Sequence, residues 1–333
     1  MAMTQPISSL QQTAATRLVA VVVTYNRLAQ LKVTIARLLE TAPETLHAVV
    51  VFDNASDDGT GAWLAAQDDP RLLVESSASN LGGAGGFAGG MSLARERYDP
   101  DWMVVMDDDA RPEPGALAAF QARDLSQWDA LAAAVYFPDG RICEMNRPSR
   151  NPFSHGRAFW RTLRRGRNGF HLSPDAYDAD HDTAIDVTSF VGFFISRRGL
   201  ELAGLPDPGL FLYGDDGLYT LGLSTRGGRI AFTPDIRFEH DCSTFASSQR
   251  GRFHPLWKVY YYHRNLLLLY RMASGWMFWP VLVIILPRWL IKARHHPGER
   301  LRFLGLIARA VRDGLLRRTG TPHRKVLSWA QKP

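Results

Sequence analysis

The sequence has little cysteine. Its 333 residues include only two, Cys143 and Cys242. Two cysteines cannot form the disulfide framework of a small secreted domain, and their spacing is not the paired spacing of a zinc site. A reducing cytoplasm is therefore the simplest compartment for this chain.

The sequence also lacks a long uninterrupted apolar segment. No run of 18 or more residues is continuously apolar, whereas a membrane-spanning helix needs about 20. The longest candidate, residues 276–286, contains Pro280 and is followed by Pro287, so we expect it to be interfacial or buried. The first residues have no signal-peptide pattern, and we expect residues 1–16 to be a disordered N-terminus.

Charge is unevenly distributed along the chain. Residues 250–333 contain 17 Lys and Arg but only two acids, whereas residues 1–249 contain 22 basic and 31 acidic residues. The basic region is also rich in Trp, Tyr and Leu. This division predicts two functions in one chain, with a membrane surface or a nucleic acid as partner of the basic part. A solvated helical face on an apolar core is the alternative.

The first half of the chain has the pattern of an α/β protein. Hydrophobic residues make up 46% and charged residues 22%, which excludes disordered, collagen-like and coiled-coil chains. We expect strands at 17–24, 47–52, 71–75 and 102–106, with helices at 28–39 and 58–67 and a third that follows a glycine-rich loop and ends near 97. This order predicts a parallel nucleotide-binding sheet, whose ligand lies at the carboxyl ends of the strands.

The second half is less regular. We expect strands at 130–136, 185–195 and 229–233 and a short helix at 214–227. Residues 149–182 read as a long loop-like insertion, and the chain from 255 onward reads as mainly helical.

Four features carry the chemistry. Asp107, Asp108 and Asp109 follow a strand, where mutual repulsion favours a divalent cation; a helix-capping turn is the alternative. Residues 80–90 hold six glycines, which suit either close approach to a ligand or tight helix packing, but no P-loop lysine follows. Asp215 and Asp216 could supply a general base or cap a helix. His240 could complete a metal site or be structural.

Together these features resemble the family 2 glycosyltransferases of the GT-A fold. The resemblance rests on residues 21–27 (VVVTYNR), Asp53, the Asn80 glycine loop, the three aspartates, residues 213–216 (YGDD) and His240. The loop NLGGAGGF and residues 260–271 (YYYHRNLLLLYR) are similar to those of galactofuranosyltransferases and rhamnosyltransferases. The resemblance covers about residues 17–271. It implies a GT-A catalytic domain over 17–249 and a separate helical region over 250–333.

The resemblance also implies residue roles. Asp107, Asp109 and His240 would hold Mn²⁺ or Mg²⁺ on the donor diphosphate, and Asp216 would be the catalytic base, with Asp215 contacting sugar or acceptor. The remaining nucleotide-sugar contacts would come from Thr24, Arg27, Asp53, Asn80, Asp107 and Arg264. Such an enzyme transfers sugar with inversion; UDP-galactofuranose is the leading donor and dTDP-rhamnose the alternative. Gly214 departs from the aromatic residue common in galactofuranan-forming relatives, which puts inherited acceptor contacts in doubt.

The basic region then favours a membrane surface over a nucleic acid. Residues 301–315 place apolar side chains on one helical face and arginines elsewhere, as in helices that lie on anionic membranes. Acceptors in this family are often polyprenyl-diphosphate-linked glycans, so we expect a cytoplasmic enzyme on the inner face of a bacterial plasma membrane. An ordinary helical bundle and homo-oligomerisation through this region are alternatives. A nucleotidyltransferase and a non-enzymatic binding module are the competing function classes.

Overall fold

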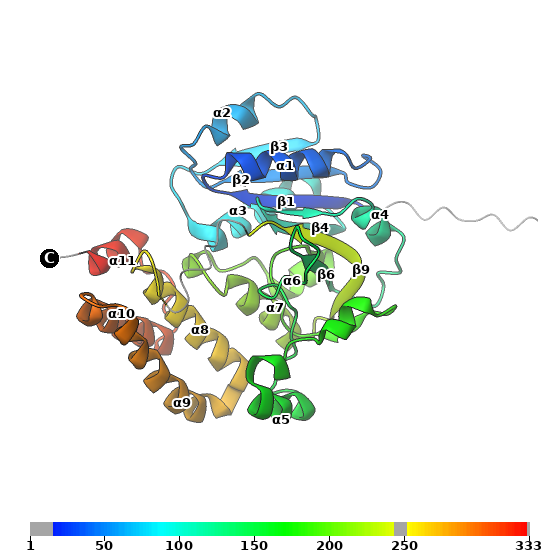
Figure 1. The fold of residues 1–333 in the computed structure, drawn as a ribbon. Coiled ribbons are helices and arrows are strands. Elements are labelled where there is room, and N and C mark those ends of the chain that lie inside the picture. The colour runs from blue at the N-terminus through cyan, green and yellow to red at the C-terminus, as the bar shows by residue number, and fades with distance from the viewer. Residues whose placement is uncertain (1–15, 243–251, 332–333) are drawn as a thin grey trace, which may run out of the picture.

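The computed structural model describes residues 16–242 and 252–331 (Figure 1). The predicted disorder of residues 1–16 falls outside this described part, apart from Thr16. An α/β unit built on one sheet carries most of the chain, and a group of C-terminal helices packs beside it.

The first half alternates strands and helices as predicted. The elements are β1 (Leu18–Thr24), α1 (Leu28–Leu39), β2 (Ala48–Asp53), α2 (Thr60–Ala65), β3 (Leu72–Ser76), α3 (Gly82–Tyr98) and β4 (Trp102–Asp107). Apolar β-branched runs such as LVAVVVT in β1 are buried along their whole length, as expected for strands covered on both faces.

The sheet is mixed, and its first four strands are parallel, as predicted. Among the described residues, nine strands join in the order β3-β2-β1-β4-β8-β6-β9-β5, with β7 also paired to β9. Strands β1 to β4 are parallel, whereas β8 runs antiparallel to both β4 and β6. The later strands are β5 (Ala110–Pro112), β6 (Ala130–Tyr136), β7 (Thr183–Ile185), β8 (Phe193–Ser196) and β9 (Ile230–His240).

Helices cover both faces of this sheet. One core joins alternate strand residues to α1, α2 and α4 (Ala116–Gln121), and the other joins the opposite residues to α3, α6 (Arg197–Ala203) and α7 (Asp215–Thr225). The carboxyl ends of β1, β2 and β4 are left open at one edge, where the polar residues gather.

The glycine-rich segment corrects one expectation. The helix begins at Gly82, so most of these glycines lie in α3 rather than in a ligand-binding loop. A Cβ at Gly86 would lie 2.4 Å from Val23, and one at Gly90 would lie 2.6 Å from Val21. The glycines therefore let α3 pack against β1 at a distance that no larger residue allows. Of the two interpretations, tight packing explains Gly86 and Gly90.

Two segments of the second half also differ from the prediction. Residues 149–182 are not only loop: they contain α5 (Gly156–Arg165) and the 3₁₀ turns η1 (Gly166–Gly169) and η2 (Pro174–Asp178). The predicted strand 185–195 is two short strands, β7 and β8, with a loop between them. Helix α5 escaped prediction because four of its ten residues are Arg and most of its side chains are exposed, with only Ala158 buried.

The C-terminal helices have their own core. They are α8 (Lys258–Ser274), α9 (Phe278–Ile291), α10 (Arg300–Leu315) and α11 (His323–Ala330), with the 3₁₀ turns η5 (Gly275–Met277) and η6 (Lys292–His295) between them. Their buried side chains, among them Tyr260, Phe303 and Leu306, form a cluster separate from the two sheet cores.

By length and composition alone, the helical run Lys258–His295 could cross a membrane. In Figure 1 this run is not straight: α8 and α9 meet at η5 and turn back on one another. Only 17% of its most apolar window is buried, so the expected segment around residue 280 is exposed rather than buried. Trp276, Trp279, Val283 and Ile284 are all more than half exposed, and we call these four residues the α9 apolar surface.

Candidate active site at the carboxyl edge of the sheet

Three adjacent strands bring the predicted donor-site residues to one edge. Strand register pairs Thr24 with Asp53 across β1 and β2, and Val23 with Asp107 across β1 and β4. The ends of these strands are thus neighbours although they are up to 83 residues apart in sequence. The edge is the place where α/β sheets of this kind bind their ligands.

The pairing of β5 with β9 brings His240 to the aspartates. Ala110 lies opposite His240 in this antiparallel pair, and His240 Nε2 lies 3.2 Å from Asp109 Oδ1. One ligand atom each from Asp107, Asp109 and His240 lies within 4.8 Å of the others. Two carboxylates and an imidazole suit a divalent cation such as Mn²⁺ or Mg²⁺. These three residues, predicted as metal ligands, are therefore brought together.

The electrostatics of this group favour a bound cation. Burial and then repulsion from Asp109 raise the pKa of Asp107 to about 6, and burial raises the pKa of Asp108 to about 7. Burial also lowers the pKa of His240, but the hydrogen bond and charge of Asp109 outweigh this effect and raise it to about 10. Carboxylates that repel one another at a partly buried edge are stabilised by positive charge.

Arg27 is a cation that faces these carboxylates. Its guanidinium forms an ion pair with Asp109 and lies 3.5 Å from Asp108 Oδ1. Asp108 also accepts a 2.8 Å hydrogen bond from the Thr24 hydroxyl. Thr24 is buried and its hydroxyl helps to orient the acidic triplet, and its contact with a nucleotide stays a prediction. Asp108 could not be identified from the sequence as the partner of Thr24, because the two residues are 84 positions apart.

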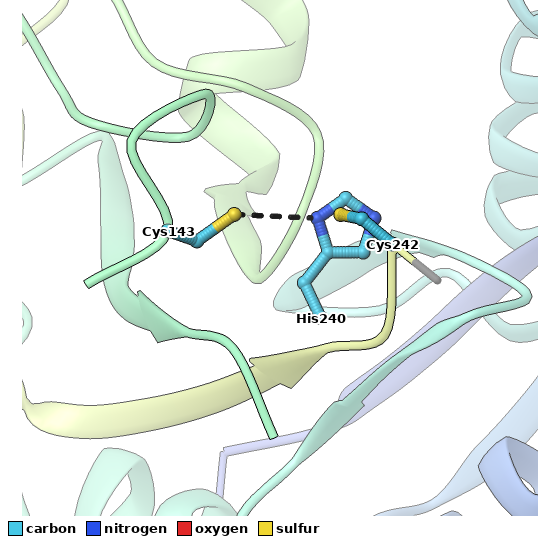
Figure 2. A group of neighbouring side chains, drawn as sticks. All are labelled: Cys143, His240 and Cys242. Carbon is cyan, nitrogen blue, oxygen red and sulfur yellow. Dashed lines mark hydrogen bonds between the residues drawn. The ribbon is translucent and has the colours of Figure 1, made fainter. Parts of the chain in front are cut away.

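The thiols of Cys143 and Cys242 lie near His240 (Figure 2), and the side-chain amide of Asn146 contacts the same ring. Cys143 Sγ lies 3.9 Å from His240 Nδ1, and Asn146 Oδ1 lies 2.8 Å from the same nitrogen. The side chains of Cys143, His240 and Cys242 also present ligand atoms within 4.8 Å of one another. The sequence spacing of the cysteines had argued against such a cluster, and the folding of the 137–146 loop over the end of β9 creates it.

Asp215 and Asp216 begin α7 at a turn with unusual backbone geometry. Phe211, Tyr213 and Gly214 all have positive φ angles, and the Gly217 amide donates a 2.6 Å hydrogen bond to Asp216 Oδ1. Burial and then the charge of Asp216 raise the pKa of Asp215 to about 8, and burial also raises the pKa of Asp216. A carboxylate with a raised pKa is suited to take a proton from a hydroxyl.

The turn is held by two polar residues of α8. Asn265 Nδ2 donates to the carbonyls of Leu210, Leu212 and Tyr213 at 2.8–3.0 Å. Beside it, Arg264 is completely buried and donates to the carbonyls of Gly209, Leu210 and Thr319. The prediction that Arg264 contacts the donor is therefore wrong: its guanidinium is directed at backbone carbonyls and positions the turn.

The two remaining predicted contacts lie at the edge and take part in local hydrogen bonds. Asp53 Oδ1 accepts from the Ser56 amide at 3.1 Å, and Asn80 Oδ1 accepts from the Gly82 amide at 2.7 Å. Asn54, which follows Asp53 at the end of β2, donates to the Gly82 carbonyl and accepts from the Leu81 amide. It thereby fixes the start of α3 against β2. Asn146 and Asn265 carry no sequence signal, because their partners are distant backbone or side-chain atoms.

The comparisons with known proteins agree with this geometry. Residues 19–184 match the family model described as Glycosyl transferase family 2. The galactofuranosyltransferase GlfT1 of Mycolicibacterium smegmatis is 28% identical over 255 residues, which cover 74% of this chain and 80% of the relative. The undecaprenyl-phosphate mannosyltransferase of Micrococcus luteus is 32% identical over 181 residues, covering 51% and 70%.

A solved structure supports the fold. The mannosyltransferase PcManGT of Pyrobaculum calidifontis, determined with GDP-mannose and Mn²⁺, aligns with a TM-score of 0.51 at 17% identity, covering 95% of this chain and 79% of that one. The acidic edge of a mixed GT-A sheet, the family match and these relatives lead to one conclusion: the chain belongs to the family 2 glycosyltransferases and is similar to galactofuranosyltransferases.

Proposed function

We propose that this glycosyltransferase moves a sugar from a nucleotide diphosphate donor to a lipid-linked glycan, with inversion and with the help of a divalent cation. The observation that carries the proposal is the convergence of Asp107, Asp109 and His240 with Asp215 and Asp216. Repulsion from Asp216 and Asp107 contributes to the raised pKa of Asp215, which supports a common role for these carboxylates.

The donor diphosphate would lie at the metal ligands. Asp107, Asp109 and His240 would hold Mn²⁺ or Mg²⁺, which neutralises the charge that develops on the leaving nucleotide. The positive charge of Arg27 would add to this stabilisation. Asp53 and Asn80, beside them at the same edge, would contact the nucleoside.

Asp216 would act as the base. It would accept the proton of the acceptor hydroxyl as the hydroxyl oxygen attacks the anomeric carbon and the bond to the nucleotide diphosphate breaks. The attack comes from the face opposite the leaving group, so the anomeric configuration inverts, through an oxocarbenium-like transition state. Asp215 would contact the sugar or the acceptor.

Galactofuranose from UDP-galactofuranose is the donor we favour, because the GlfT1 relative aligns over 255 residues. Rhamnose from dTDP-rhamnose is the alternative. We infer a location on the cytoplasmic face of a bacterial plasma membrane, because the α9 apolar surface adjoins a region rich in arginine. Interfacial tryptophans and basic residues together favour an anionic membrane.

Paired variants test the active site. Asp216→Asn should keep metal-dependent nucleotide binding but lose transfer by about 10²- to 10⁴-fold, which is the usual contribution of a general base. Asp109→Asn should lose nucleotide binding as well. Calorimetry with UDP and Mn²⁺ separates the two effects. Normal transfer by Asp216→Asn would show that another group is the base.

Vesicle sedimentation tests the membrane contact. Replacing Trp276 and Trp279 by Ser should reduce binding of the full chain to vesicles containing anionic lipid, because each exposed indole loses its favourable interfacial position. Trp160, on α5, offers a matched exposed tryptophan on a different helix. Unchanged sedimentation of the Trp276/Trp279 double variant would contradict the assignment of this surface.

A further inference from the structure

A cavity of about 460 Å³ runs from the catalytic turn along the outer side of α7. Its lining includes Asp215, Leu218, Tyr219 and Gly222 of α7 and Arg226 at the C-terminal cap of that helix, which recur at helical spacing and therefore form one face. Eleven residues of helix rise by about 16 Å. The cavity is thus an elongated groove with a catalytic aspartate at one end and an arginine at the other.

Three arginines gather in the lining of this groove. Arg226, on α7, and Arg271, on α8, are joined by Arg317, which follows α10. Hydrogen bonds to carbonyls position two of them: Arg226 Nη1 lies 3.3 Å from Ala203 O, and Arg271 Nη1 lies 2.9 Å from Leu315 O. Arg317 adopts a positive φ angle, and its side chain is exposed.

Among the described residues, ion pairs neutralise some arginines of the C-terminal helices but not the three in this groove. Arg312 and Arg302 of α10 pair with Asp313 and Glu299. Among the described residues, none of the three groove arginines forms an ion pair. The acids in the lining are Asp215, at the catalytic end, and Asp207, whose carboxylate accepts from the Gly209 amide. The groove therefore carries an excess of positive charge.

The groove also opens toward the apolar side of the helices. Leu205 and Leu268 line it, and Met272, next to Arg271 on α8, is 40% exposed. Trp276, in η5 and four residues after Met272, is 83% exposed, and the rest of the α9 apolar surface follows. Exposed apolar side chains thus follow the arginine end of the groove along the chain, toward the surface proposed above to contact the membrane.

We propose that this groove binds the acceptor as an isoprenoid-diphosphate-linked glycan and fixes its direction. The diphosphate would lie on Arg226, Arg271 and Arg317, the glycan along α7 toward Asp215, and the lipid over Met272 toward α9. Guanidinium groups suit phosphate because they donate paired, charge-assisted hydrogen bonds. This inference rests on the proposed function and adds the residues that select the acceptor.

The separation of the two ends has a consequence for the acceptor. The attacking hydroxyl must reach the catalytic carboxylates while the diphosphate stays at the arginines, so the groove length sets the span between them. A short oligosaccharide would fill this span, whereas a sugar attached directly to the diphosphate would leave its hydroxyl short of Asp215, the aspartate that lines the groove. The arginines would thereby select acceptors of a minimum glycan length.

Binding of farnesyl diphosphate to the full chain in EDTA tests the proposal without knowledge of the natural acceptor. Removing divalent cations prevents metal-bridged diphosphate binding at the donor site, so binding that persists reports the groove. We expect farnesyl diphosphate to bind, and Arg226→Gln, Arg271→Gln and Arg317→Gln each to weaken it about tenfold, as the loss of a charge-assisted contact would. Arg318→Gln is the matched control, since Arg318 neighbours Arg317 but does not line the groove.

Two further binding measurements separate the groove proposal from the proposed function. Inorganic pyrophosphate should bind much more weakly than farnesyl diphosphate, and equal binding would overturn the assignment to a lipid-linked ligand. UDP binding with Mn²⁺ is measured on the same wild-type preparation. If UDP binds but farnesyl diphosphate does not, or if Arg226→Gln and Arg317→Gln leave its binding unchanged, the groove proposal fails and the proposed function stands. Absence of UDP binding would instead contradict the proposed function.

Discussion

Two groups of buried polar residues, one at the acidic edge of the sheet and one on α8, differ in how completely the fold satisfies them. Arg264 and Asn265 on α8 direct their donors at backbone carbonyls around the catalytic turn. At the edge, Asp107, Asp215 and Asp216 repel one another, and burial raises the pKa of each. A buried group with a full set of partners supports the structure, whereas a group held against its neighbours' charge is available to a ligand or a proton.

The largest expected effect is on nucleotide release, and it distinguishes the roles of two adjacent carboxylates at the edge. Asp109→Asn should lower metal-dependent nucleotide release by about a thousandfold or more, because it removes a charged metal ligand. Asp108→Asn should have a much smaller effect, since Asp108 accepts from Thr24 and an amide oxygen can do the same. Steady-state assays of both variants make the comparison. Equal losses would show that Asp108 also holds the cation.

The second-largest expected effect is on stability, and it concerns the buried Arg264 of α8. Arg264→Met should lower the free energy of unfolding by about 3–5 kcal/mol, because it leaves buried carbonyls without donors. Urea denaturation measures this change. Arg288→Met, which alters an arginine elsewhere in these helices, is the control. If Arg264→Met were as stable as the wild type, the carbonyl contacts would not be what holds the catalytic turn.

The pH dependence of stability extends the comparison to a buried histidine of α8. Burial, followed by the positive charge of Lys292, lowers the pKa of His263 to about 3, and its imidazole is completely buried on α8. Because the folded pKa lies below the ordinary value of about 6.5, this contribution to stability is complete above that pH and is lost as the pH falls toward 3.

Acid denaturation of wild type and His263→Phe tests this sign. The wild type should lose several kcal/mol between about pH 6.5 and 3 from this group, so its stability should fall more steeply with acid than that of His263→Phe. Parallel pH profiles for the two proteins would show that His263 does not resist protonation in the folded state.

The smallest expected effect concerns the residue behind His240. Asn146 Oδ1 accepts from His240 Nδ1–H in the tautomer that leaves Nε2 facing Asp109. Asn146→Ala should weaken Mn²⁺ binding about 10- to 100-fold, the usual effect of removing an outer-shell partner. Calorimetric titration with Mn²⁺ measures it, and Asn151→Ala, five residues further along the chain and away from His240, is the control. Unaltered affinity would show that the ring is held by packing alone.

The sequence predicted what depends on local pattern. Continuous apolar runs located β1, β2 and β4, and the polar residues that end them located the edge, because strand ends in a parallel sheet lie together. The association of His240 with the aspartates came from the family resemblance, and the β5–β9 pairing supplies its physical basis.

The remaining features depend on contacts between distant segments. Arg264 has a basic side chain that suits phosphate, but its partners at residues 209, 210 and 319 are carbonyls that leave no trace in the sequence. The Cys143–Cys242 proximity requires the 137–146 loop to fold over β9. The glycines of α3 were compatible with a ligand-binding loop, because composition does not distinguish close helix packing from close approach to a ligand.

The central claim is that the acidic edge uses a divalent cation to release nucleotide from one sugar donor. The most direct measurement is nucleotide release from UDP-galactofuranose, UDP-galactopyranose, UDP-glucose, dTDP-rhamnose and GDP-mannose, each with Mn²⁺ and with EDTA. We predict Mn²⁺-dependent release from UDP-galactofuranose alone. Release from dTDP-rhamnose or GDP-mannose would keep the site but change the donor. Release that is equal in EDTA, or silence across the panel together with no binding of UDP, would contradict the account.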